Sequence, residues 1–259
     1  MTDKEILLSR IHDKKAEADK NVMITHSAFL SVDEINDSGF INMKNYNGVK
    51  AFHFGGFSEA ERQVIFFVPE CFGISDISEY FSECKDDNPI AAVKVIKDRF
   101  SSLSHRDYLG AIMGLGIKRE LVGDIITCDF GAYIICFKSI ASFIVENLTR
   151  GGRGKLNCSV VDIENVELPT EKTEIRFHSV ASLRLDNIMS SGFNIPRSVC
   201  GEYVNKGVVF INSVRVLKVD APVREHDKLV VRGKGKIVLE KVIGENKKGR
   251  VHINIKHYL

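Results

Sequence analysis

The chain has 259 residues, of which 44% are hydrophobic and 27% charged, which is enough apolar material for two or three small domains. Its net charge of +2 is unevenly distributed: residues 181–259 hold 15 Lys or Arg and 7 Asp or Glu, whereas residues 1–180 hold 21 and 27, and such a basic module predicts a polyanionic partner such as RNA or DNA. The sequence has no apolar run of about 18 residues, no secretory signal pattern, no Cys-x-x-Cys pair among its six cysteines and no cofactor motif, so we expect a cytoplasmic protein without a membrane span, bound metal or cofactor.

Residues 1–78 have the pattern of an α+β domain. A helix is expected over 3–20, and Asp33 and Glu34 after Ser31 resemble the start of another. Strands are expected over 49–54 and 63–68.

Residues 79–165 alternate as strand, helix, strand, strand, helix and strand. The segments are 90–96, 104–115, 124–128, 132–137, 139–148 and 155–163. This order is the split βαβ of the ferredoxin-like fold, which RNA-recognition motifs share. Tyr133 and Phe137 do not align with the RNA-reading strand of those motifs, so we predict that they are core or interface residues. The Gly-rich stretch around Arg150 and Arg153 either touches RNA or links two elements.

Residues 181–259 read as two short helices packed on a small curled sheet. Ser182 is expected to cap a helix that Gly192 ends, and Pro196 to begin a second helix that Gly207 ends. The five strands that follow are expected over 208–211, 214–216, 228–232, 236–242 and 251–255.

This C-terminal module resembles a known RNA-binding domain. The residues that carry the resemblance lie at 183–186, 196–197, 207–212 and 226–236, and they match the ribosomal protein S-four type of domain, also called the αL motif, in order and spacing. The resemblance covers nearly all of 181–259. Together with the patterns of residues 1–165, this resemblance predicts an α+β fold class, with an N-terminal α+β domain, a central RRM-like domain and a C-terminal S-four-type RNA-binding domain.

The module departs from that family's pattern at three positions. Pro196, Ser213 and His226 stand where the family usually has Ser, Gly and Gly. These changes are expected to stiffen or strain turns, and none removes a positive charge.

The basic residues of this module are placed to bind phosphate. Arg184 and Arg197 each open a helix, where a guanidinium and the first backbone N–H groups can hold a phosphate together. Asp186 either orients a neighbouring arginine or favours the positive end of its helix. Arg232, Lys234 and Lys236 alternate with glycines in a turn that resembles a phosphate clasp. The predicted RNA-binding residues are Arg184, Asp186, Arg197, Lys206, Arg232, Lys234, Lys236, Lys248 and Arg250.

Two further segments, 55–62 and 104–125, look like diagnostic parts of the bacterial YlmH family, and with them the resemblance spans almost the whole chain. That family is similar to cytoplasmic, ribosome-associated RNA-binding proteins. The resemblance implies binding to the large ribosomal subunit, to ribosomal RNA and to tRNA, in quality control of stalled nascent chains.

The run His105-Arg106-Asp107 invites a catalytic interpretation. A protein kinase loop would place Asn where Ile112 stands, and the His-Arg-Leu-Asp run of pseudouridine synthases would need a Leu that is missing here. The alternative is structural: Ser104 caps a helix and Asp107 complements its dipole. We therefore expect no catalytic residue, with Arg106, Arg150 and Arg153 as candidates for additional RNA contacts.

The sequence thus predicts a non-enzymatic RNA-binding protein that binds ribosomal RNA or tRNA on the large subunit. Two alternatives remain at this point. One is an interaction protein of the cell-division machinery with incidental RNA affinity, and the other is an RNA-modifying pseudouridine synthase.

Overall fold

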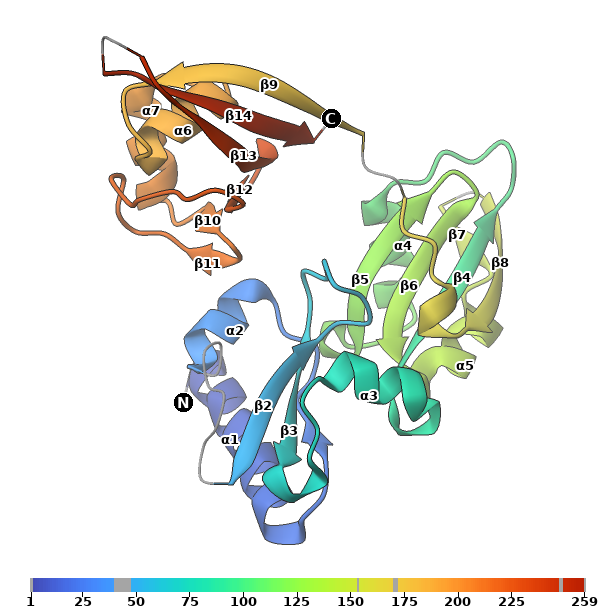
Figure 1. Ribbon diagram of the computed structural model, residues 1–259. Coiled ribbons are helices and arrows are strands. Elements are labelled where there is room, and N and C mark those ends of the chain that lie inside the picture. Colours follow the sequence, from blue (N-terminus) through green and yellow to red (C-terminus); the bar gives the residue numbers. More distant parts are fainter. Residues whose placement is uncertain (1, 40–47, 153, 170–171, 247–248, 259) are drawn as a thin grey trace. The chain divides into compact units, whose positions relative to one another are not determined.

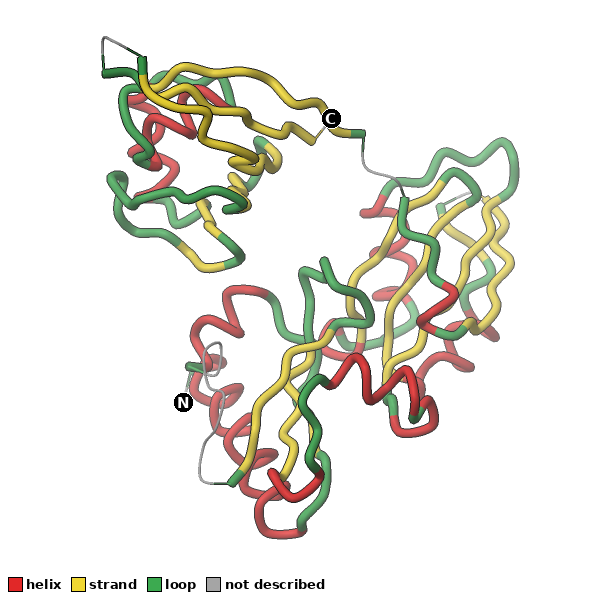
Figure 2. The backbone as a smooth tube through the Cα atoms, viewed as in Figure 1, coloured by secondary structure: helices red, strands yellow, loops and turns green. Residues whose placement is uncertain are grey.

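The computed structural model describes residues 2–39, 48–152, 154–169, 172–246 and 249–258, and the chain divides into two compact units, Met1–Pro169 and Thr170–Leu259. Figure 1 labels the elements of both units, and Figure 2 shows how helices and strands alternate along the chain. All strand pairs in the three sheets are antiparallel. Within the described ranges, no helix is long and apolar enough to cross a membrane.

The first part of unit 1 is a three-stranded sheet with helices beside it. Its strands have the order β1-β3-β2. The elements are α1 (Asp3–Asn21), β1 (Thr25–His26), α2 (Val32–Ser38), β2 (Val49–Phe54), β3 (Val64–Pro69) and α3 (Ile77–Glu83). The predicted helix start after Ser31 is confirmed, because Ser31 and Glu34 form a capping box at the start of α2.

The second part of unit 1 is a five-stranded sheet in the order β5-β6-β4-β8-β7. Its elements are β4 (Ile90–Lys97), α4 (His105–Gly114), β5 (Val122–Cys128), β6 (Gly131–Phe137), α5 (Lys138–Asn147), β7 (Arg150–Gly151) and β8 (Gly154–Val161). The predicted order of strand, helix, strand, strand, helix and strand is present, with β7 as a short addition. Helices α4 and α5 cover one face of this sheet, where Tyr108 and Ile144 pack on Val93 and Ile134.

The other face of the five-stranded sheet packs against the N-terminal sheet. Ile135 and Phe137 of β6 share a core with Phe29, Phe66 and other apolar residues of the N-terminal part. Every residue of β3 and of β6 is buried, because each strand is covered on both faces. This explains why both strands are continuous apolar runs instead of alternating patterns.

Two glycines allow the sheets to approach closely. A Cβ on Gly123 would lie 2.7 Å from the Phe29 ring, and one on Gly56 would lie 2.8 Å from Ile163. Gly56 also has a positive φ of 98°, which side chains rarely adopt. Both positions therefore require glycine.

A polar joint beside these glycines ties the two sheets together. The Asp124 carboxylate accepts the backbone N–H groups of Glu61 (2.6 Å) and Arg62 (3.1 Å). The Arg62 guanidinium donates to the carbonyls of Val122 and Phe29, at 3.2 and 2.7 Å. Burial raises the pKa of Asp124, and the two N–H groups partly offset that rise.

Substituting Asp124 with Ala should lower the free energy of unfolding by about 1–3 kcal/mol, because it leaves two backbone donors unsatisfied in the joint. Urea denaturation measures this change. The exposed Asp19 of α1 provides the matched control, since Asp19→Ala should change stability by less than about 0.5 kcal/mol. Equal effects of the two substitutions would contradict the role given to Asp124.

Unit 2 packs two helices against one six-stranded sheet, in the strand order β11-β10-β12-β13-β14-β9. Its elements are β9 (Thr173–Val180), α6 (Leu185–Gly192), α7 (Arg197–Asn205), β10 (Val209–Ile211), β11 (Val214–Arg215), β12 (Lys228–Val231), β13 (Gly235–Glu245) and β14 (Val251–Tyr258). Ile188 and Met189 of α6 share a core with Ile237, Leu239 and Ile253 of the sheet.

The structure corrects one expectation for this unit and adds one strand that was not predicted. Ser182 does not cap the first helix: Arg184 is the N-cap residue, and the Ser182 hydroxyl instead accepts a hydrogen bond from Asn187 Nδ2 at 2.7 Å. The edge strand β9, which pairs with β14 along its whole length, was not predicted.

Two turn residues of unit 2 adopt left-handed backbone. Ser213 and His226 have φ values of 67° and 68°. The expected strain is therefore present at both positions, and it costs roughly 1–2 kcal/mol for a residue with a side chain.

A pair of histidines joins the edge strand β9 to its neighbour β14. The Nε2 atoms of His178 (β9) and His257 (β14) lie 3.2 Å apart, and Ser191 Oγ of α6 lies 2.8 Å from His178 Nδ1. Burial lowers the pKa of both rings, and the neighbouring Arg176 lowers each further. The pair is therefore neutral in the folded protein at neutral pH.

Acidification should destabilise unit 2 through this pair. Because the folded-state pKa of each ring is below the ordinary value of about 6.5, the stabilising contribution is complete above that pH and is lost as the pH falls through the lowered values. The fall in melting temperature between about pH 7.5 and pH 5.5 should be smaller for His178→Gln/His257→Gln than for the unaltered protein. An identical fall in both proteins would show that the pair stays uncharged or is not coupled to folding.

Candidate nucleic-acid interface

Unit 2 carries the positive charge of the chain. Residues 170–259 hold 17 Lys or Arg and 9 Asp or Glu, whereas residues 1–169 hold 19 and 25. The boundary between the compact units is thus also the boundary between a basic and an acidic part. An anionic ligand is attracted to the first and repelled by the second.

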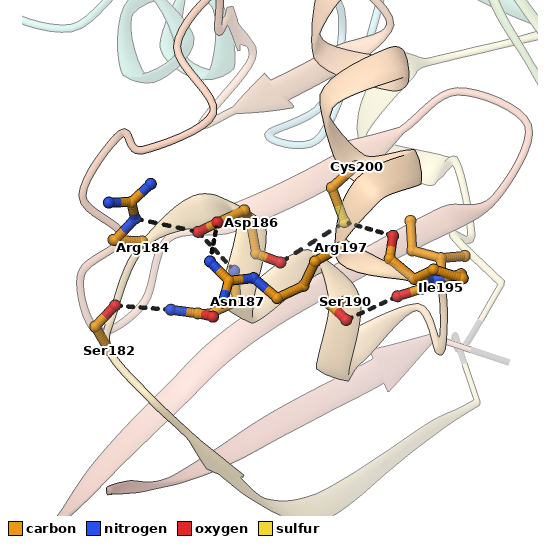
Figure 3. Close-up of polar contacts among 9 residues, drawn as sticks. Ser182, Arg184, Asp186, Asn187, Ser190, Ile195, Arg197 and Cys200 are labelled. Atoms are coloured by element: carbon orange, nitrogen blue, oxygen red, sulfur yellow. Dashed lines mark hydrogen bonds and ion pairs between the residues drawn. The ribbon is translucent and has the colours of Figure 1, made fainter. Parts of the chain in front are cut away.

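At the start of the two helices of unit 2, one carboxylate holds two arginines. Arg184 Nε donates to Asp186 Oδ1 at 3.3 Å, and Arg197 Nη2 donates to Asp186 Oδ2 (Figure 3). Arg184 precedes α6, Asp186 lies in its first turn, and Arg197 is the first residue of α7. We call these three residues the arginine clasp.

Burial differs sharply within the arginine clasp. The Asp186 side chain is 10% exposed, whereas those of Arg184 and Arg197 are 50% and 55% exposed. Burial acts to raise the pKa of Asp186, but the contacts with Arg197 and Arg184 outweigh it and leave that pKa below its ordinary value. The carboxylate is therefore charged at neutral pH and orients both guanidiniums while they remain accessible.

The turn between the helices is fixed by local hydrogen bonds. Ser190 Oγ donates to the carbonyl of Ile195 at 2.7 Å, and Cys200 Sγ contacts the carbonyls of Asp186 and Pro196 at 3.6 and 3.5 Å (Figure 3). Pro196 is the N-cap residue of α7 and has no N–H to satisfy. These contacts set the direction of α7 and hence the position of Arg197 opposite Asp186.

Of the predicted phosphate-binding residues Arg232, Lys234 and Lys236, the first two lie in the turn between β12 and β13, and Lys236 lies in β13 opposite Val230. Gly233 and Gly235 have φ values of 83° and 114°, so the turn uses the conformations that only glycine adopts easily. Arg232 lies over the Phe210 ring at 4.7 Å, and Lys236 lies over Tyr258 at 4.3 Å. The predicted residues thus form two groups, one at the helix starts and one at the sheet.

The remaining predicted residues of unit 2 have other surroundings. Lys206 follows α7 and lies 4.0 Å from Glu202, an exposed pair of small energetic value. Arg250 donates to the carbonyl and the hydroxyl of Ser179, which joins the β13–β14 hairpin to β9. Lys248 lies outside the described residues.

In unit 1, the sheet face opposite α4 and α5 is not available to RNA. Tyr133 and Phe137 are 1% and 6% exposed, as predicted for core or interface residues. Phe29 packs on Phe137 with ring centroids 4.7 Å apart, and Ile163 of the segment after β8 packs on the same face. Bases cannot stack there in the way that they do on RNA-recognition motifs.

His105, Arg106 and Asp107 form the first turn of α4. Asp107 accepts the N–H and the hydroxyl of Ser104 at 2.7 Å each, as the capping interpretation predicted. Arg106 is exposed. No group of three or more His, Cys, Asp or Glu side chains in the described parts of the chain is arranged to hold a metal ion.

A loop that the sequence did not single out presents an aromatic ring to solvent. Phe100 is 99% exposed, and Arg99 precedes it. Asp98 shapes this loop, because its carboxylate accepts hydrogen bonds from Phe100 N, Ser101 Oγ and Lys155 N at 2.9–3.0 Å. The last of these bonds holds the loop against the β7–β8 hairpin.

The predicted contact Arg150 lies in the same hairpin. It is exposed and pairs in register with Lys155. Arg153 lies outside the described residues. The signal that would have identified this region from sequence is the adjacency of a basic and an aromatic residue in a polar loop.

Arg119, a basic residue after α4, is turned towards the backbone and away from a role in the basic surface. The Arg119 guanidinium donates to the carbonyls of Val122 and Gly123, close to the polar joint with Arg62. Burial and, to a smaller extent, the positive charge of Arg62 together lower the pKa of Arg119 to about 10. Arg119 is therefore part of the joint between the sheets.

Three known proteins or families are similar to this chain. Residues 85–165 match a family model described as "Putative RNA-binding domain in YlmH". Over 197 residues the chain is 32% identical to the ribosome-associated protein quality control protein P2 of Bacillus subtilis (strain 168), an alignment that covers 76% of this chain and 73% of that protein. The solved structure of cell division protein ylmH from Streptococcus pneumoniae superposes with a TM-score of 0.49 at 17% identity, covering 64% of this chain and 96% of that one.

The class defined here is a mixed α+β protein that contains a domain of a family described as RNA-binding. The similarity to the Bacillus subtilis protein extends over most of both chains, and it therefore identifies the family of the whole chain. The chain belongs to the YlmH family.

Proposed function

We propose that the protein is a non-enzymatic, cytoplasmic RNA-binding protein that binds ribosomal RNA or tRNA on the large ribosomal subunit and acts in quality control of stalled nascent chains. Its membership of the YlmH family and its similarity to a ribosome-associated quality control protein support this role. In this proposal the chain has an N-terminal α+β domain (1–78), a central RRM-like domain (79–165) and a C-terminal S-four-type domain (181–259).

The observation that carries the proposal is the arginine clasp. A guanidinium has five N–H donors, and the contact with Asp186 engages one nitrogen of each arginine. Two half-exposed guanidiniums fixed by a buried carboxylate are suited to phosphate oxygens, because their orientation is set before the ligand arrives. Because RNA repels the acidic unit 1 and attracts the basic unit 2, the protein should bind an RNA surface through unit 2.

We assign secondary phosphate contacts to Lys206, to Arg232, Lys234 and Lys236, and to Arg250 and Lys248. Exposed lysines contribute general affinity, which falls as salt rises. In unit 1, Arg106, Arg150 and Arg153 are assigned additional contacts, and the exposed ring of Phe100 is assigned to stacking with a base. Because the sheet face of the central domain is covered, we assign the RNA contacts of this domain to its exposed surface outside that face.

The double substitution Arg184→Ala/Arg197→Ala should weaken binding to a ribosomal RNA hairpin by about tenfold or more. It should also reduce the magnitude of the slope of log affinity against log salt by about 2, because two phosphate contacts are lost. Fluorescence anisotropy at several salt concentrations measures both quantities.

A matched control removes the same charge from the same unit at two exposed positions, Arg176 and Lys218. Arg176→Ala/Lys218→Ala should leave the affinity within about threefold, because those residues lie outside the arginine clasp. If both double variants lose affinity equally, binding depends on net charge alone and the assignment of the arginine clasp fails.

A further inference from the structure

The sheet of unit 2 has two different faces. Val180, Ile237, Leu239, Ile253 and Ile255 point to the face that packs on α6 and α7. Side chains alternate along a strand, and residues directly opposite each other in register share a face. The residues between them therefore lie on the face away from the helices.

That second face is aromatic and cationic. Its members from β9, β13 and β14 include Phe177, Lys236, Lys241, His252, Lys256 and Tyr258, which we call the open face. Phe177 is 61% exposed, and Ile175 next to it on the same face is 56% exposed. A contiguous patch of large exposed apolar side chains, as on this edge strand, commonly marks an interaction site.

The aromatic rings of the open face already contact cations or other rings. Lys236 Nζ lies 4.3 Å from the centroid of Tyr258, and Lys256 Nζ lies 5.9 Å from it. The His252 and Phe177 rings lie 5.1 Å apart with an angle of 33° between their planes. A ring bordered by ammonium groups can accept a stacked base while the ammonium groups meet its phosphate.

Acidic residues are kept off this face by the strand register. Glu174 lies opposite His257 and Glu245 opposite Val251, on the face that carries the helices. Glu240 lies at the bulge between Leu239 and Lys241. The charge of the open face therefore selects an anionic partner, and its rings select one that carries flat, unsaturated groups.

We infer that the open face binds unpaired nucleotides of a single-stranded RNA segment, with bases stacked on Phe177 and Tyr258 and phosphates at Lys236, Lys241 and Lys256. Tyr258 lies opposite Thr173, four residues along β9 from Phe177. The two rings are therefore roughly 14 Å apart, a distance that serves two different nucleotides. A duplex cannot use these rings, because its bases are stacked on one another.

This inference goes beyond the proposed function, since the arginine clasp lies on the helices and was argued to bind the phosphates of structured RNA. A protein with both surfaces can hold a folded RNA element and an adjacent unpaired segment at once. Linked binding of this kind raises the affinity for RNA that presents both features.

The test uses the full-length protein and two labelled probes, an oligouridine of about ten nucleotides and a fully paired RNA hairpin. Phe177→Ala should weaken oligouridine binding about 5- to 150-fold and leave hairpin binding within about twofold. Phe177→Tyr should retain oligouridine binding, whereas Phe177→Leu should lose it, because leucine keeps an apolar contact but has no ring. Phe143→Ala removes a comparably exposed ring from α5 and should change neither affinity.

The outcomes separate this inference from the proposed function. Loss of hairpin binding in Arg184→Ala/Arg197→Ala with retained oligouridine binding supports two independent surfaces. If Phe177→Ala weakens oligouridine binding while the arginine variant leaves hairpin binding unchanged, the inference stands and the proposed function fails. The inference is overturned if the unaltered protein does not bind oligouridine at low salt, or if Phe177→Leu binds it as well as the unaltered protein, which would indicate an apolar partner.

Discussion

The ion contacts of Asp186 determine how unit 2 presents its charge. A carboxylate that is 10% exposed would be costly to bury alone, and the two arginines offset that cost. In return the carboxylate restricts two long, otherwise mobile side chains that come from two different helices. Because Asp186 lies in the first turn of α6 and Arg197 begins α7, the packing of the two helices and the orientation of the guanidiniums depend on the same contact.

Unit 1 shows the opposite use of arginine. Arg62 and Arg119 donate mainly to backbone carbonyls, and their guanidiniums hold two sheets together. This joint, together with the apolar core shared by β3 and β6, covers the sheet face on which an RNA-recognition motif would bind bases. The acidic unit is thus built around an internal interface, and its most exposed large hydrophobic side chain, Phe100, lies in a loop away from that interface.

Much of this architecture could be predicted from the sequence. The split βαβ order of the central elements and the two short helices of unit 2 follow from apolar periodicity and from glycine and proline positions. The edge strand β9 was missed although Ile175 and Phe177 alternate with Glu174, Arg176 and His178, because this apolar run is short and seven of the eight residues of the strand are not buried. That strand supplies Phe177, so the most exposed part of the open face was missed with it.

The details of the candidate sites depend on contacts between distant residues. The sequence indicated that Arg184 and Arg197 begin helices, but not that both would contact one carboxylate, because the chain between Asp186 and Arg197 has to turn back first. Likewise, nothing in the run Lys118-Arg119 distinguishes a surface cation from one that binds carbonyls. Local pattern specifies the elements, and the tertiary packing decides what each charged group contacts.

The most direct test of the account is sedimentation of cell lysate through sucrose gradients at low and high salt, with the unaltered protein compared with Asp186→Asn. The unaltered protein should migrate with free large subunits at low salt and leave them at high salt. Asp186→Asn raises the net charge by one and yet should reduce this association by about tenfold, because it releases both arginines. The control, Asp220→Asn at an exposed position, makes the same change in net charge and should not reduce the association. If Asp186→Asn associates as strongly as the unaltered protein or more strongly, the positioned arginines are not the basis of binding and the central claim is wrong.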